Sequence, residues 1–147
     1  MTQEEKQKAR AADRWLSRYR AALVECRTCK RQLVKLRSMA RSIGGPDLQQ
    51  TPVVSGRVSD VTQAAAIAIA EASDELHRRI RDAMVVRRQV EQAVRRIRDD
   101  RDRALIELRY IECRSYASIA DEMDYSDASN ARRRIWRALG RMELPRV

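Results

Sequence analysis

Apolar and small residues recur along the first third of the chain at the spacing of a coiled-coil helix. From Trp15 to Ile43 the steps between them alternate between four and three residues, which predicts a helix with one continuous apolar stripe. Thr2 and Glu5 have the spacing of a capping box, and a Gly-Gly-Pro sequence directly after Ile43 stops the helix. We therefore expect one helix over residues 2–43. The stripe consists of Trp15, Tyr19, Ala22, Cys26, Cys29, Leu33, Leu36, Ala40 and Ile43.

A second segment of the same kind follows a stretch rich in Gly, Pro, Gln, Ser and Thr. This stretch, residues 44–58, is expected to be a linker. Ser59 or Asp60 is expected to cap a helix that ends near Asp99. Arg87 is the one large polar residue in the stripe, where it either pairs with a carboxylate or packs its stem. The stripe consists of Leu76, Ile80, Ala83, Arg87, Val90, Val94 and Ile97.

The two segments predict a long antiparallel helical hairpin with a coiled-coil seam. Each helix has about 40 residues, or roughly 60 Å at 1.5 Å per residue. Equal lengths joined by a modest loop favour antiparallel pairing. One such seam is too narrow to cover all the apolar surface of both helices, so we expect a homodimer or a higher homo-oligomer. Whether the helices pair within one chain or between chains is left open.

The pattern changes after the charged run at residues 98–103, which we interpret as a solvated helix junction. Three shorter helices are expected beyond it, at residues 104–113, 116–123 and 127–142. The predicted fold is therefore all-α. A hairpin region at residues 1–100 precedes a three-helix domain at residues 101–147.

The last two of these helices have the pattern of a helix-turn-helix, in which a short helix and a tight turn position a second helix for the major groove. Ser115 can cap the first helix, and Ser126 the second. Ile119, Ala120 and Met123 are expected to face inward. Asp124 occupies the turn, where we expect a positive φ that Asp tolerates better than most residues.

The last helix separates its residues by face at ~100° per residue. Ala128, Ala131, Ile135, Ala138, Leu139 and Met142 cluster on one side, and polar residues lie opposite. Arg can bind guanine and Asn can bind adenine through two hydrogen bonds each. We predict base contacts from Ser129, Asn130 and Arg133, and phosphate contacts from Ser126, Arg132, Arg134 and Arg137. Trp136, at the edge, is expected to pack against a neighbouring helix or a second subunit, with a contact to the DNA backbone as the alternative.

Charge favours a polyanionic partner without locating it. The formal net charge is +10, but residues 1–43 alone contain 12 Lys/Arg and 4 Asp/Glu, a net of +8. Residues 101–147 contain 10 Lys/Arg and 8 Asp/Glu, a net of +2. Duplex DNA and an acidic membrane surface would both attract such a chain. The stripe of the helix at residues 1–43 contains small and polar-tolerant residues and no Phe, which disfavours the membrane.

Residues 108–139, LRYIECRSYASIADEMDYSDASNARRRIWRAL, resemble region 4 of bacterial sigma factors. They are more similar to the ends of small phage and prophage regulators, including the RinA/ArpU-like regulators of late genes and a related uncharacterised phage family. The resemblance implies a phage or prophage transcriptional regulator, with Ser126, Ser129, Asn130 and Arg133 on the recognition helix. Cys113 and Asp124 stand where the family usually has Gly. The chain lacks a segment resembling the part of a sigma factor that opens promoters.

Other chemistry has little support in the sequence. Cys26 and Cys29 lie at successive stripe positions, as small buried residues do, and zinc would need two further ligands where only Cys113 and His77 remain. A single His and no Gly-rich phosphate loop give no basis for an enzyme, and no cofactor is expected. No apolar run is long enough to span a membrane, and the first residues do not resemble a signal peptide. We expect reduced thiols in the cytoplasm of a bacterial host cell.

The pattern therefore predicts a sequence-specific regulator that binds double-stranded DNA through the helix at about residues 127–142. Two alternatives remain open. One is a small terminase-like subunit that recognises DNA for packaging, because such proteins also join a helix-turn-helix to long oligomerising helices. The other is an adaptor that binds RNA polymerase without DNA specificity, in which case the Arg face would contact an acidic protein surface.

Overall fold

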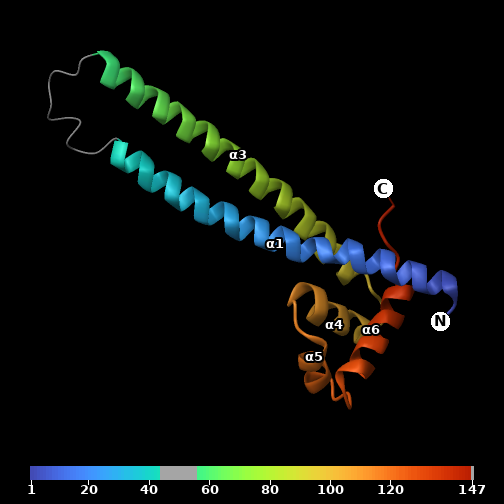
Figure 1. The fold of residues 1–147 in the computed structure, drawn as a ribbon. Helices are drawn as coiled ribbons and strands as arrows, with labels where there is room; N and C mark the ends of the chain where they lie inside the picture. The colour runs from blue at the N-terminus through green and yellow to red at the C-terminus, as the bar shows by residue number, and fades with distance from the viewer. Residues whose placement is uncertain (44–55, 147) are drawn as a thin grey trace. The chain divides into compact units, whose positions relative to one another are not determined.

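A computed structural model describes residues 1–43 and 56–146, and these residues form helices and connecting segments without a strand (Figure 1). The prediction of an all-α chain is confirmed. Most of the predicted linker, residues 44–55, lies outside the described residues. The elements are α1 (Gln3–Ile43), α3 (Gly56–Arg95), α4 (Asp100–Ile106), the π-helix η1 (Glu107–Ile111), α5 (Tyr116–Glu122) and α6 (Ala128–Arg141).

Helix α1 begins with the predicted capping box. The Thr2 backbone N–H donates to Glu5 Oε2 at 2.7 Å, and the Glu5 backbone N–H donates to Thr2 Oγ1 at 3.2 Å. Trp15 is half-buried against the core as the stripe predicted, but the fully buried Leu16 beside it was missed, and the stripe position Ala40 is exposed. The buried residues of α1 are Ala9, Ala12, Leu16, Tyr19, Ala22, Cys26, Cys29 and Leu33.

Helix α3 starts at Gly56 and ends at Arg95, earlier at both ends than predicted. The expected caps Ser59 and Asp60 therefore lie inside the helix, and that prediction is wrong. The predicted stripe is buried or half-buried throughout, and it is most deeply buried at Val90 and Val94. Arg87 lies over the ring of Tyr19, with the guanidinium carbon 5.8 Å from the ring centroid.

The described residues form two compact units, and one of them is Val24–Met84. Here the later part of α1 packs on the earlier part of α3 through a small cluster of Cys29, Leu33 and Leu76. Arg79 Nε donates to Glu25 Oε1 at 2.6 Å and joins the same two helices. This hydrogen bond holds the pKa of the Glu25 carboxyl below its usual range. Large apolar side chains remain exposed in this unit at Val24, Val34, Met39, Val61, Ile67 and Met84.

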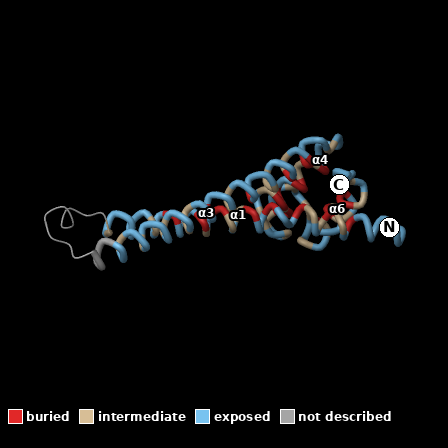
Figure 2. Tube along the Cα trace, turned by 90° about the horizontal axis from the view of Figure 1, so that it is seen from above, coloured by how far each residue is buried: buried red, intermediate tan, exposed pale blue. Residues whose placement is uncertain are grey.

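The other unit combines Met1–Leu23 with Val85–Val147 and contains most of the buried residues (Figure 2). These units differ from the predicted regions 1–100 and 101–147, because the first part of α1 packs with the C-terminal helices. Tyr110 donates its hydroxyl to Asp13 Oδ1 at 2.6 Å across this contact. Burial raises the pKa of Tyr110 well above its usual value. The shared core includes Ala9, Leu16, Val94, Leu105, Ile106, Ile119, Ile135 and Leu139.

The segment before α5 differs from the single helix predicted at residues 104–113. It begins at Asp100, capped by Asp99, whose carboxylate accepts from the Asp102 backbone N–H at 2.8 Å. It then widens into η1 and ends at Cys113, which has a φ of 56°. The Arg114 backbone N–H donates to Leu108 O at 3.0 Å across that end. The charged run is also not wholly solvated as predicted, because Asp102 is buried.

Candidate nucleic-acid interface

Helix α5 is positioned by a cap at its first turn and by a small apolar face. Ser115 accepts a hydrogen bond from the Ser118 backbone N–H at 3.1 Å, so the predicted cap is confirmed. Ile119 and Ala120 are buried and Met123 is half-buried, as predicted. Because Ala120 is small, the buried face of α5 can lie close to α6.

The turn after α5 has the geometry of a Schellman motif. The Tyr125 backbone N–H donates to Ala120 O at 2.8 Å, and the Met123 backbone N–H donates to Ile119 O at 2.9 Å. Asp124, between them, has a φ of 58°, which confirms the positive φ predicted there. This left-handed residue reverses the chain within a few positions, so α6 begins close to the end of α5.

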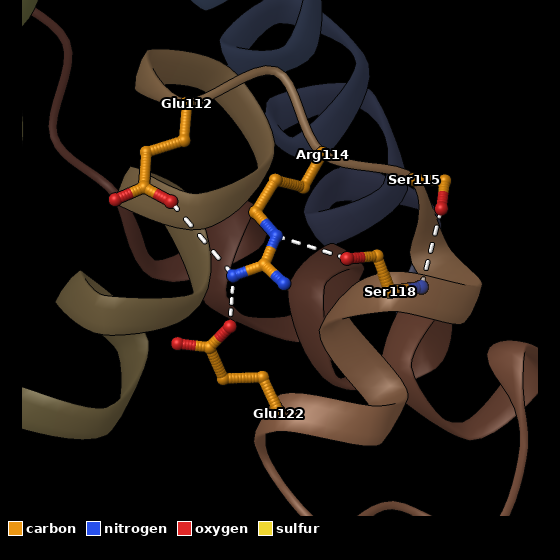
Figure 3. A network of polar contacts seen from close by, with 5 residues as sticks. All are labelled: Glu112, Arg114, Ser115, Ser118 and Glu122. Carbon is orange, nitrogen blue, oxygen red and sulfur yellow. Dashed lines mark hydrogen bonds and ion pairs between the residues drawn. The ribbon is translucent and has the colours of Figure 1, made fainter.

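A polar network around Arg114 ties α5 to the segment that precedes it (Figure 3). Arg114 Nε donates to Ser118 Oγ at 2.9 Å, and Arg114 Nη1 pairs with Glu122 at the far end of α5. Glu112 Oε2 lies 3.9 Å from the same Nη1. Arg114 therefore spans α5 on its outer side, opposite the buried face.

Helix α6 (Ala128–Arg141) is capped by Asp127 and not by Ser126. The Asp127 carboxylate accepts from the Asn130 backbone N–H at 2.8 Å, which makes Asp127 the N-cap. The predicted cap at Ser126 is wrong because its hydroxyl is instead bonded to the Asn130 side chain. A carboxylate thus occupies the positive end of the α6 dipole, where the sequence argument placed a hydroxyl and an anion.

The two faces of α6 separate as predicted. Ala131, Ile135, Ala138 and Leu139 are buried, and Ala128 and Met142 are half-buried. On the outer face Ser129, Arg132, Arg133 and Arg137 are exposed and Asn130 is half-buried. Among the described residues, neither Arg132, Arg133 nor Arg137 forms an ion pair. The outer face therefore presents three guanidinium groups that no acidic side chain of the described residues pairs with.

Asn130 and its neighbours line a shallow hollow at the start of α6, of about 310 Å³. Asn130 Nδ2 donates to Ser126 Oγ, so these two of the predicted DNA-contacting side chains are bonded to each other. Arg133 and Arg137 also line this hollow. Asn130 would have to release Ser126 before its amide could bind a base with two hydrogen bonds.

Arg134 is placed differently from the other predicted phosphate-binding residues. Its Nη2 lies 3.5 Å from the carboxylate of Asp102, and Arg141 Nη2 approaches the same carboxylate at 2.9 Å. Asp102 is only 4% exposed and is the buried acidic residue of the described part of the chain. This geometry favours a structural role for Arg134, in which it joins α6 to α4.

The sequence reasoning missed Asp102 and Asp127. Asp102 belongs to the same inward face as Leu105 and Ile106, at helical spacing, and this spacing would have identified it within the charged run. A capping side chain accepts from the backbone N–H three residues later, and both Asp127 and Ser126 have such a residue at the start of α6. Spacing alone therefore could not show that Asp127, and not the predicted Ser126, caps the helix. The hydrogen bond that the Asp127 carboxylate accepts from the Asn130 backbone N–H separates them.

Within residues 1–43 and 56–146 no three His, Cys, Asp or Glu residues gather as a metal site, and the three cysteines are free thiols. The described helices include none that is long and apolar enough to span a membrane. Comparison with family models, with curated proteins and with solved structures finds no match to this chain. The resemblance to sigma region 4 therefore stays a prediction that depends on residues 108–139.

Proposed function

We propose that the protein is a sequence-specific transcriptional regulator that binds double-stranded DNA through a helix-turn-helix formed by α5 and α6. The observation that carries the proposal is the outer face of α6. Arg132, Arg133 and Arg137 are exposed there next to Ser129 and Asn130, and no described acidic residue pairs with them, while the opposite face is buried. A helix with this division can present its donors to DNA without losing its packing.

The dimensions of α6 suit the major groove. An α-helix with its side chains is about 10–12 Å in diameter, which matches a groove about 12 Å wide. The 14 residues of α6 give it a length of roughly 21 Å at 1.5 Å per residue. The short α5 and the turn at Asp124 leave the outer face of α6 uncovered by either element. In this arrangement the long helices α1 and α3 form the hairpin that joins subunits and sets the spacing of two DNA-binding heads.

The outer residues divide by the atoms they offer. Arg133 lies in the middle of the outer face, and we assign it to a base, with guanine as the ligand it suits best. Ser129 and Asn130 border it and complete the proposed base contacts. Arg132 and Arg137 lie to its sides, and with Ser126 they are proposed to bind phosphates. Arg134 was predicted to bind phosphate as well, but we propose that its ion pair with Asp102 instead joins α6 to α4.

Selection from a random-sequence duplex library tests this function. The purified chain should enrich a common sequence, and it should bind the enriched duplex more tightly than a scrambled one. The variant Asn130→Ala/Arg133→Ala should lose most of that preference, because each lost pair of hydrogen bonds to a base costs about 1–3 kcal/mol.

Arg88→Ala/Gln89→Ala is the matched control, because it removes one guanidinium and one amide from exposed positions of α3. It should keep the preference of the wild type. Weak, equal binding of every duplex by wild type and variant would refute sequence-specific recognition and favour the RNA polymerase adaptor. A large ring of subunits in solution would favour the terminase-like subunit over the regulator.

A further inference from the structure

The first turns of α1 lie against α6 at a position where α6 has no side chain. A Cβ atom built on Gly140 would lie 3.3 Å from the backbone oxygen of Glu5 and 3.7 Å from Met1 Cε. Ala9, Ala12 and Leu16 continue this contact into the core that also buries Ala138 and Leu139. The close approach of the two backbones fixes the start of α1 beside the outer face of α6.

A cleft of about 690 Å³ lies between these two helices and is lined mainly by cationic side chains. Lys6 and Arg10 contribute from α1, and Arg132, Arg133 and Arg137 contribute from α6. None of the five forms an ion pair within the described residues. Five like charges around one hollow repel each other and create a positive potential that an anion would relieve.

Two further features connect the cleft with the outer face of α6. Arg133 and Arg137 line both the cleft and the hollow beside Asn130, so the two surfaces are continuous. Trp136 also lines the cleft, and its buried indole nitrogen has no hydrogen-bond acceptor among the described residues.

We infer that this cleft binds the phosphodiester backbone of the same DNA duplex whose bases α6 reads, with Lys6 and Arg10 as phosphate-binding residues. The inference rests on the proposed function. It makes α1 a second DNA-contacting element, joined to α6 through the close contact at Gly140. It also gives part of the basic charge at the start of the chain a defined ligand.

Phosphate contacts leave a signature that base contacts do not. They weaken binding to all sequences alike, and each contact contributes about 0.9 to the slope of log affinity against log salt. The variant Lys6→Ala/Arg10→Ala should therefore lower the slope by about 1–2. Its affinity for the enriched and the scrambled duplex should fall by the same factor, of about tenfold.

The matched control is Lys35→Ala/Arg37→Ala, which removes one Lys and one Arg from exposed positions further along α1. It should keep the wild-type slope. Lys6→Arg/Arg10→Lys keeps both charges and should restore the slope, which separates a loss of charge from a disturbed helix. Circular dichroism checks that each variant is folded.

The outcomes separate the two proposals. If the wild type prefers an enriched duplex and Lys6→Ala/Arg10→Ala matches Lys35→Ala/Arg37→Ala in slope and affinity, the inference about the cleft is wrong and the proposed function stands. If the wild type binds no duplex, both proposals fail together. A uniform loss of affinity and a reduced slope in Lys6→Ala/Arg10→Ala alone would establish the cleft as a phosphate site.

Discussion

Asp102 offers the sharpest test of how α6 is held in place. Its carboxylate is buried and accepts from Arg141 at 2.9 Å, with Arg134 at 3.5 Å. The variant Asp102→Asn keeps the shape of the side chain and removes its charge. Both guanidinium groups then lose their acidic partner at the junction of α4 and α6.

The size of the effect follows from two opposing contributions. At an effective dielectric constant of about 20, charges ~3 Å apart attract by about 6 kcal/mol. Burying the carboxylate costs several kcal/mol of this. The arginine side chains are 30% and 56% exposed, so water can solvate them once Asp102 is neutral. We expect Asp102→Asn to lower the free energy of unfolding by about 2 kcal/mol, between the values for surface and fully buried pairs.

Urea denaturation followed by circular dichroism measures this change, and Asp100→Asn provides the control. Asp100 pairs with Arg103 at 2.6 Å, but its side chain is 90% exposed, so its loss should be indistinguishable from wild type. A midpoint for Asp102→Asn equal to that of Asp100→Asn, or above that of the wild type, would refute the reasoning. It would mean that desolvation of the carboxylate cancels its attraction to both arginines.

Three further predictions concern the caps and turns around α4, α5 and α6. Cys113→Gly should raise the free energy of unfolding by about 1 kcal/mol and Asp124→Gly by less, measured in urea, because Gly relieves a positive φ that Asp tolerates better than Cys. Asp127→Ser should keep α6 capped, because Ser can also accept from the Asn130 backbone N–H. It should tighten DNA binding roughly fivefold in a low-salt titration, because it removes a negative charge from the proposed interface. An unchanged affinity would mean that this cap lies away from the DNA phosphates. The hydrogen bond from the Asp102 backbone N–H lowers the pKa of the Asp99 carboxyl in the folded protein. The ionised Asp99 carboxylate therefore stabilises the fold fully above the unfolded pKa of about 3.9, and this stabilisation is lost as the pH falls through the lower folded pKa. Asp99→Asn, which keeps a cap, should therefore have a lower melting temperature than wild type at neutral pH, and the two should converge in acid.

Local sequence motifs and the spacing of apolar residues predicted the features of the fold that lie within a single helix or turn. The capping box of α1, the cap of α5 at Ser115 and the positive φ of Asp124 each depend on a few neighbouring residues. The buried face of α6 followed from spacing for the same reason. These features need no knowledge of what the helix packs against.

Features that depend on a distant partner escaped the same reasoning. Leu16 is buried beside Trp15 because the first part of α1 packs on the C-terminal helices and not only along the seam of α3. Asp102 lies within a run of charged residues, and its burial depends on two arginines more than thirty positions away. Equally, the charge count alone could not pair Lys6 and Arg10 with α6.

The charge distribution along the chain becomes intelligible once the acidic partners are considered. The C-terminal segment has a net charge of only +2, but several of its acidic side chains are engaged in contacts that stabilise the fold. Asp102 binds two arginines and Glu122 binds Arg114, while Asp127 caps α6. The remaining arginines of α6 form no ion pair with any described residue, and the start of α1 adds two more cations beside them. We therefore base the proposed interface on the positions of these cations and not on the net charge of any segment.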